Sequence, residues 1–276
     1  MVVQHNLKAM NSNRMLGLTQ STQAKSTEKL SSGYKINRAA DDAAGLAISE
    51  KMRRQVRGLT QAAANAQDGI SMVQTAEGAL NEVHDMLQRM NELAVKAENG
   101  TLKSDDRDYI DAEVQQLMSE IDRVASTTTF NENNLLDGKG GTTGDGKFAL
   151  QVGAEKGQHI DLEIKAMKCS KIGLTAGLSA KTATQAAALN TAVKRAIVNV
   201  SEQRSSLGAV QNRLEHTINN LNNVVENTTS AESAIRDTDM ATEMVKFSNN
   251  NILAQAGQAM LAQANQSNQG VLSLLG

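Results

Sequence analysis

The fold is decided by the stretch Leu59–Ala97, which reads LTQAAANAQDGISMVQTAEGALNEVHDMLQRMNELAVKA. Its apolar residues recur in steps of three and four, which predicts an α-helix with one apolar side. The pattern holds for more than five heptads, as in helices that pack along another helix. At a rise of about 1.5 Å per residue, this helix would be about 60 Å long. Its apolar positions are Leu59, Ala63, Ala66, Ile70, Val73, Leu80, Val83, Leu87, Met90, Ala94 and Ala97.

Two adjacent carboxylates, Asp41 and Asp42, lie upstream in an alanine-rich run. A catalytic pair would need both groups to face one substrate, but neighbouring side chains on a helix point about 100° apart. Aspartate near a helix start interacts favourably with the helix dipole. The pair therefore predicts a helix start rather than an acid–base site.

A second apolar seam begins near Ala186 and reaches Ile235, which predicts a helix about 65 Å long. Between the two seams, a shorter helical pattern runs from Ile110 to Val124. A glycine-rich region follows, in which FALQV (148–152) and IDLEI (160–164) alternate apolar and polar residues. This alternation predicts two or three short antiparallel strands, and the small polar segment 167–184 predicts a loop.

Two seams of similar length separated by a hairpin region favour antiparallel packing of both helices. The chain contains no proline and no tryptophan, with only three phenylalanines and two tyrosines among 276 residues. A compact core of this size normally holds more aromatic volume. The sequence therefore predicts a mainly α protein, a rod-like bundle of long antiparallel helices with a small β-hairpin region.

Both ends of the chain are amphipathic, and the C-terminal end is rich in asparagine and glutamine. Two helices alone bury too little surface to offset the entropy of ordering them. We therefore expect the ends to be poorly ordered in a free monomer and to fold against neighbouring copies. The residues predicted to mediate polymerisation are Leu7, Met10, Leu18, Val245, Ile252, Leu253, Met260, Leu261, Leu272 and Leu275.

Composition and motifs argue against several chemical functions. The formal net charge is −2, which favours neither nucleic acid nor an acidic membrane surface as a partner. Residues 141–147, GTTGDGK, match a phosphate-binding loop, but Phe148 replaces the required serine or threonine and a strand is predicted to follow. The four histidines have no metal-ligand spacing, and the single cysteine, Cys169, cannot form an intramolecular disulfide. We predict no catalytic residue, cofactor, metal or membrane segment.

One helical face offers a choice between two interpretations. Arg89, Glu92, Leu93 and Lys96 lie beside the seam, with Leu93 expected to be partly exposed. A solvated surface is the simpler interpretation, while an exposed arginine and leucine on one face also suit a partner's binding site.

Two long motifs carry a resemblance to a known family. They are LSSGYKINRAADDAAGLAISEKMRRQVRGL (30–59) and MATEMVKFSNNNILAQAGQAMLAQANQSNQGVLSLLG (240–276). The chain resembles a short bacterial flagellin across residues 1–165 and 185–276, although Asn268 stands where family members often carry proline.

The resemblance implies a discontinuous two-domain subunit of the flagellar filament, used for swimming. Residues 1–40 and 236–276 would form the inner filament core, and 41–166 with 185–235 a rod domain of long helices and β-hairpins. Segment 167–184 would replace the variable domain of larger members. The alternative within the superfamily is a hook–filament junction protein, whose C-terminus usually departs from ILAQAGQAMLAQANQ.

The resemblance also implies a location and partners. The first residues lack the apolar h-region of a signal peptide, so we expect no cleaved leader. The resemblance implies export through the flagellar type III system to an extracellular filament. Implied partners are further copies of the chain, an export chaperone at the C-terminal segment, and the filament cap and hook-junction proteins. A Toll-like receptor of an animal host would contact Arg89 and Leu93, supported by Glu113. A further alternative, a flagellin with a protease insertion, lacks support because the insertion and the H-E-x-x-H motif are missing.

Overall fold

A computed structural model describes residues 6–141, 144–175 and 177–272, with the side chains of 268–272 left out of the description. The chain forms two compact units. The terminal unit comprises Met1–Val56 and Glu226–Gly276, and the central unit comprises Arg57–Val225. The domain boundaries predicted from the sequence, 40/41 and 235/236, lie closer to the ends of the chain than the boundaries of these two units. The predicted boundaries refer to the inner and outer layers of an assembled filament.

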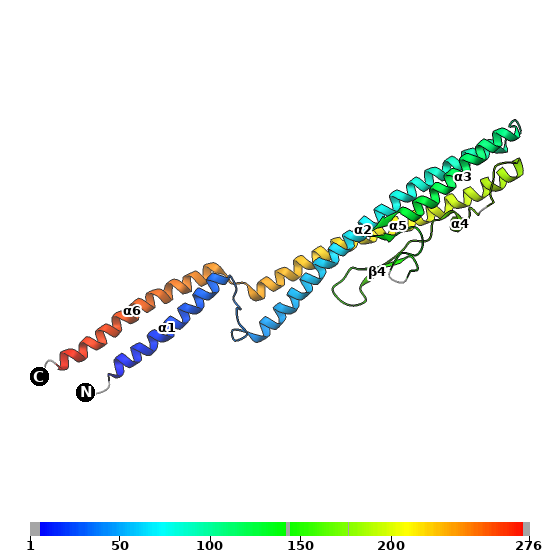
Figure 1. Cartoon of the computed structure of the whole chain (residues 1–276). Helices are drawn as coiled ribbons and strands as arrows, with labels where there is room; N and C mark the ends of the chain where they lie inside the picture. The colour runs from blue at the N-terminus through cyan, green and yellow to red at the C-terminus, as the bar shows by residue number, and fades with distance from the viewer. Residues whose placement is uncertain (1–5, 142–143, 176, 273–276) are drawn as a thin grey trace. The chain divides into compact units, whose positions relative to one another are not determined.

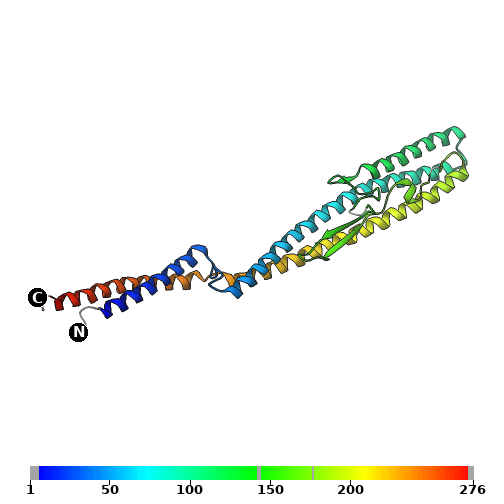
Figure 2. The ribbon, with the colours of Figure 1, turned by 60° about the horizontal axis from the view of Figure 1, so that its bottom comes forward.

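The described residues are mainly helical, which confirms the predicted fold class (Figures 1 and 2). Among the residues that the structure describes, the short strands lie in the middle of the chain. In chain order the elements are α1 (Leu7–Ser32), α2 (Ala43–Glu98), α3 (Ser104–Thr127), β1 (Thr129–Phe130), β2 (Asn133–Asn134), β3 (Lys147–Gln151), β4 (His159–Glu163), α4 (Cys169–Ile172), α5 (Ala183–Arg236) and α6 (Met240–Leu272).

The start of α2 is built from the two adjacent aspartates. The Gly45 N–H donates to Asp42 Oδ1 at 2.9 Å, which satisfies a backbone donor of the first helical turn. Asp41 Oδ2 accepts from the backbone N–H groups of Arg38 (3.0 Å) and Asn37 (3.2 Å), and these bonds lower the pKa of Asp41. The predicted helix start is confirmed for Asp42, whereas Asp41 binds the backbone of the turn that precedes α2.

The apolar seam of α2 runs through the central core. All of the predicted seam residues are buried except Ala63, which is half-buried while Ala62 is buried beside it. The gap that the sequence pattern leaves between Val73 and Leu80 is filled by Ala76, which is fully buried. Alanine was not recognised there because a single small residue gives a weak periodic signal.

Helix α5 runs antiparallel to α2 within the central unit (Figures 1 and 2). Asn190 donates to Glu98 at 2.8 Å near one end of the pair, and Arg204 lies 3.7 Å from Glu77 further along. The α5 seam is buried as far as Leu221, except that Ile197 is half-buried while Ala196 is buried beside it. Its predicted continuation is wrong in detail, because Val224, Thr228 and Ile235 are only half-buried and Ala231 is exposed.

Helix α3 and the strands complete the central core. The α3 side chains Ile110, Val114 and Ile121 share one apolar cluster with α2 and α5. Strands β3 and β4 pair antiparallel, with Phe148 opposite Leu162, and this confirms the hairpin predicted from FALQV and IDLEI. A second, two-residue pair, β1 with β2, was not predicted.

The hairpin approaches α2 where the helix carries glycines. A Cβ atom added to Gly69 would lie 2.5 Å from Leu150, and one added to Gly58 would lie 2.9 Å from Ala154. The absence of side chains at these two positions therefore permits the contact.

Segment 167–184 differs from the polar loop predicted for it. It contains the short helix α4 and buries Met167, Cys169, Ile172, Leu174 and Ala180 in the central core. Two carboxylates of α3 fix its backbone: Asp122 accepts from the Cys169 N–H and Asp111 from the Ala180 N–H, both at 2.8 Å. The pattern was missed because the apolar residues are spaced irregularly and their packing is set by tertiary contacts.

Truncation of a seam residue tests the central core. We expect Leu80→Ala to lower the free energy of unfolding by about 2–5 kcal/mol, because Leu80 is fully buried. The control Val198→Ala, at a position that is 56% exposed, should change it by less than about 0.5 kcal/mol. Urea denaturation followed by circular dichroism measures both, and equal effects would contradict this assignment of the core.

Candidate functional site

The terminal helices α1 and α6 pack side by side and antiparallel (Figures 1 and 2). Asn6 Nδ2 donates to the Ala264 carbonyl at one end, and Ser26 pairs with Glu243 towards the other. Among the described side chains of these two helices, the buried ones are Leu16, Ser26, Glu243 and Ala254. Because two of these four are polar, the pair has little apolar core of its own.

The buried polar pair links the two helices. The Ser26 hydroxyl donates to Glu243 Oε1 at 2.7 Å, and Lys246 Nζ lies 3.3 Å from Glu243 Oε2. The hydrogen bond from Ser26 outweighs desolvation and lowers the pKa of Glu243. A lowered carboxyl pKa stabilises the folded pair above the ordinary pKa of glutamate, and this contribution is lost as the pH falls through the lowered value.

Large apolar side chains on α1 and α6 are left exposed. Of the predicted polymerisation residues, seven are 57–69% exposed and Leu261 is half-buried. The side chain of Leu272 is not described, and Leu275 lies outside the described residues. Met15, Met240 and Met244 are exposed in the same way and were not predicted. The seven are Leu7, Met10, Leu18, Val245, Ile252, Leu253 and Met260.

So much exposed apolar surface on two neighbouring helices is unusual for a soluble monomer and typical of an interaction surface. The sequence did not indicate that these three methionines would be exposed, because methionine is also common as a packing residue inside cores. We call the exposed apolar residues of both helices the terminal apolar surface.

A tight backbone junction holds the end of α1 against the α5–α6 connection. Gly33 ends α1 with a positive φ of 76°, a conformation that glycine adopts without steric cost. Its carbonyl accepts from the Thr238 N–H at 2.9 Å, and the Lys35 N–H donates to the Arg236 carbonyl at 2.6 Å. The Arg236 guanidinium lies 4.6 Å from the centre of the Tyr34 ring and 3.2 Å from Glu50.

This junction was not predicted, since its partners lie about two hundred residues apart in the chain. It sets the register of α1 against α6 from the end opposite to the chain termini.

The second candidate surface lies on α2 and α3 of the central unit. Arg89 donates through Nε to Glu113 Oε1 at 2.9 Å and through Nη1 to Glu92 at 3.2 Å. The hydrogen bond with Glu113 raises the pKa of Arg89. Two of the three predicted receptor-contact residues are therefore in direct contact, and both remain about half exposed.

Leu93, the third of these residues, is only 3% exposed. The expectation of a partly exposed Leu93 is wrong, because α3 packs across this part of α2 and takes Leu93 into the apolar core with Ile110. A hollow of about 500 Å³ lies over it, lined by Arg89, Leu93, Tyr109 and Glu113 among others. Tyr109 is 77% exposed beside this hollow and was missed by sequence reasoning.

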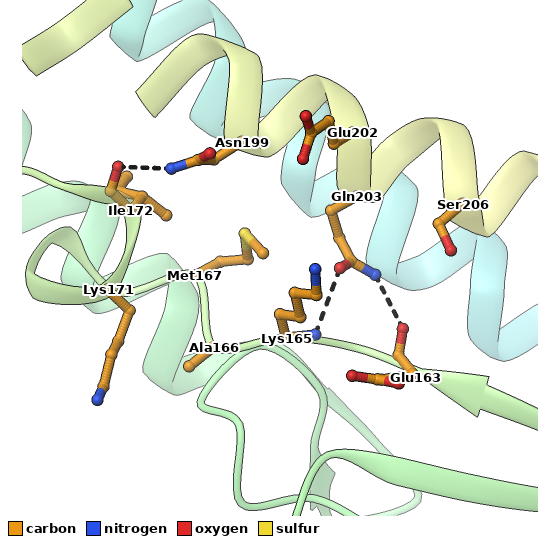
Figure 3. A pocket seen from close by; sticks show the side chains of 10 residues that line it. All are labelled: Glu163, Lys165, Ala166, Met167, Lys171, Ile172, Asn199, Glu202, Gln203 and Ser206. Carbon is orange, nitrogen blue, oxygen red and sulfur yellow. Dashed lines mark hydrogen bonds between the residues drawn. The ribbon is translucent and has the colours of Figure 1, made fainter. Parts of the chain in front are cut away.

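A further hollow, of about 510 Å³, lies between α5 and the segment after β4 (Figure 3). The Gln203 amide spans its wall, donating to the Glu163 carbonyl at 3.0 Å and accepting from the Lys165 N–H at 3.4 Å. Asn199 donates to the Ile172 carbonyl at 3.0 Å. These amides serve the backbone of the core, and the hollow brings together no set of catalytic groups.

Other features of the described residues bear on whether the chain could bind a metal, react or cross a membrane. They contain no group of three or more histidine, cysteine, aspartate or glutamate side chains that could hold a metal ion. The thiol of Cys169 is buried, and desolvation raises its pKa to about 12, so the reactive thiolate is scarce at neutral pH. Lys147 begins β3 rather than a helix, so GTTGDGK lacks the context of a phosphate-binding loop. No helix in the described part is both long and apolar enough to cross a membrane.

Comparisons with known proteins agree over the whole chain. Residues 3–140 match the bacterial flagellin N-terminal helical region, and residues 190–275 match the bacterial flagellin C-terminal helical region. The chain is 53% identical to the flagellin of Halalkalibacterium halodurans and 48% identical to that of Bacillus subtilis, with all of each chain covered. It is 49% identical, again over both full lengths, to a flagellar filament 31.3 kDa core protein of Treponema maltophilum.

One solved structure is also similar. The crystal structure of Bacillus cereus flagellin aligns with a TM-score of 0.51 and 32% sequence identity, covering 57% of this chain and 88% of that one.

A charge within the terminal apolar surface tests its role. We expect Leu253→Asp to abolish self-association while leaving the helices folded, because Leu253 is 57% exposed in the single chain. Burying the new carboxylate against another copy would leave it unpaired. Electron microscopy measures assembly and circular dichroism measures helicity, with the apolar control Leu253→Met retaining both. Loss of the bulk helical signal in Leu253→Asp would contradict the assigned position.

Proposed function

Because this chain belongs to the bacterial flagellin family and is a structural subunit of the flagellar filament rather than an enzyme, we propose that it polymerises through its terminal apolar surface after export. The route is the flagellar type III system, and the product is an extracellular filament. The inner layer of the filament comprises residues 1–40 and 236–276, and the outer layer comprises 41–166 and 185–235 with the short segment 167–184.

The observation that carries this proposal is the contrast between the two units. The central unit buries a continuous apolar cluster of its own. Among the described side chains of α1 and α6, four are buried and seven predicted contact residues are exposed. Burying a leucine, isoleucine or methionine contributes about 1.5–3 kcal/mol, so several such contacts per copy offset the entropy of assembly. Contacts between copies in the filament then offset the entropic cost of ordering the ends.

The remaining partners follow from the same surface. An export chaperone that covers the C-terminal segment would shield Val245, Ile252 and Leu253, which are exposed on α6. The filament cap and the hook-junction proteins would meet the terminal helices at the two ends of the polymer. The alternative, a hook–filament junction protein, would form no long filaments alone, so negative-stain imaging of the purified full-length chain separates the two functions.

Removal of the C-terminal helix tests the polymerisation proposal. We expect deletion of residues 241–276 to leave a soluble, helical protein that no longer polymerises, because half of the terminal apolar surface is lost. Sedimentation measures polymer and circular dichroism measures helicity. The full-length chain is the control and should pellet under the same conditions, and long filaments of the truncated chain in the pellet would defeat the proposal.

Recognition by a Toll-like receptor of an animal host is the second part of the proposal. In it, Arg89 and Glu113 contact the receptor directly, and Leu93 supports them from the floor of the hollow. Support comes from their arrangement, since a half-exposed arginine held by a carboxylate beside an exposed tyrosine has the composition of a binding hot spot.

A matched pair of arginines tests this surface. We expect Arg89→Ala to weaken binding of the monomer to the receptor ectodomain by about tenfold or more, as for an interface hot spot. Arg123→Ala is the control, because Arg123 makes a comparable exposed ion pair with Glu120 on α3. Surface plasmon resonance measures both affinities, and equal losses would remove Arg89 from the contact.

A further inference from the structure

The turn between α2 and α3 carries the one asparagine–glycine pair in the sequence, Asn99–Gly100. Asn99 directly follows the last residue of α2, and both residues of the pair are exposed to solvent. No part of the proposed assembly or receptor surfaces uses either residue. We propose that Asn99 is a site of spontaneous deamidation, a covalent modification in which water is the only co-reactant.

The nucleophile of this reaction is the backbone nitrogen of Gly100. Within the described residues the Gly100 N–H donates to no acceptor, unlike the N–H groups of the preceding helix. The space around Gly100 is also open, because a Cβ atom added there would meet nothing within 4 Å. The nitrogen can therefore approach the Asn99 side-chain carbon without breaking a backbone hydrogen bond or displacing a neighbour.

The same turn activates the electrophile. The Thr101 N–H donates to Asn99 Oδ1 at 3.3 Å, which orients the side-chain carbonyl towards the turn. When Gly100 N attacks Asn99 Cγ, negative charge develops on Oδ1, and a donor already aimed at this oxygen stabilises that charge.

The atoms balance without an oxidant or a reductant. A bond forms between Gly100 N and Asn99 Cγ, and the proton of the Gly100 N–H passes through water to the side-chain nitrogen. The bond between Cγ and Nδ2 then breaks, ammonia leaves, and a five-membered succinimide results. Water then adds to one of the two ring carbonyls and opens the ring. Opening at one carbonyl gives aspartate, and opening at the other gives isoaspartate, whose backbone passes through the former side chain.

The surroundings tolerate the new carboxylate. A negative charge at a helix C-terminus opposes the helix dipole, but Arg107 lies at the same turn. Its guanidinium donates to the Asn99 carbonyl at 3.0 Å and to the Ala97 carbonyl at 2.9 Å. A cation already bound to this turn partly offsets the added charge, so the modified chain keeps its fold with a net charge one unit below the original −2.

The test uses the full-length protein incubated in mildly alkaline buffer and then digested with trypsin. We expect the peptide 97–103 to gain one mass unit over time and to give both aspartate and isoaspartate forms, resolved by chromatography and by an isoaspartate methyltransferase assay. The peptide 124–139, which carries the exposed turn Asn131–Glu132 with no glycine after the asparagine, is the internal control and should gain no mass. Isomerisation at its Asp137–Gly138 pair leaves the mass unchanged, so mass is the quantity compared between the two peptides.

Two variants sharpen the result. Gly100→Ala fits the open space at this turn and should slow the reaction by about tenfold, equal to about 1.4 kcal/mol of activation free energy. Asn99→Asp should retain the helical signal of the parent protein. An unmodified Asn99 after incubation, or equal rates at Asn99 and Asn131, would overturn the proposal, as would an unchanged rate in folded Gly100→Ala.

Discussion

The apolar seam of α2 is the contact on which the central unit depends. Alanine, leucine, valine and methionine repeat along it, and helices α3 and α5 and the β3–β4 hairpin all contribute to the same cluster. Small residues matter as much as large ones, because Gly58 and Gly69 permit the hairpin to approach the helix. The seam explains how a chain with few aromatic residues still buries a continuous core.

In the terminal unit, α1 and α6 have fewer packing partners than the helices of the central unit. A pair of helices has one shared face, so the part of the chain that the structure describes leaves the remaining apolar side chains of α1 and α6 exposed. The pair is fixed instead by directional contacts, namely the buried Ser26–Glu243 hydrogen bond and the junction around Arg236. Such contacts give a defined geometry and little apolar burial, which suits a subunit whose apolar faces are completed by other copies.

Polar side chains perform much of the positioning in the central unit. Asp111, Asp122 and Gln203 each bind backbone groups at the end of β4 or in the segment between β4 and α5. In this way the described part of that segment is held in the core. The Arg89–Glu113 pair differs, because both partners are about half exposed and join α2 to α3 at the surface.

The sequence alone determined the helices, the hairpin and the helix start at Asp41–Asp42, because heptad spacing, strand alternation and helix capping are local physical effects. The sequence also indicated which apolar residues of the terminal helices would be exposed, since a pair of helices has too few partners to bury them.

Only the tertiary structure decided the burial of Leu93, the packing of 167–184, the role of Gln203 and the Arg236–Tyr34 junction. Each depends on which residue from a distant part of the chain arrives as a neighbour. Local periodicity fixes the face of a helix on which a side chain lies, whereas the solvent exposure of that face is fixed by the element packed over it.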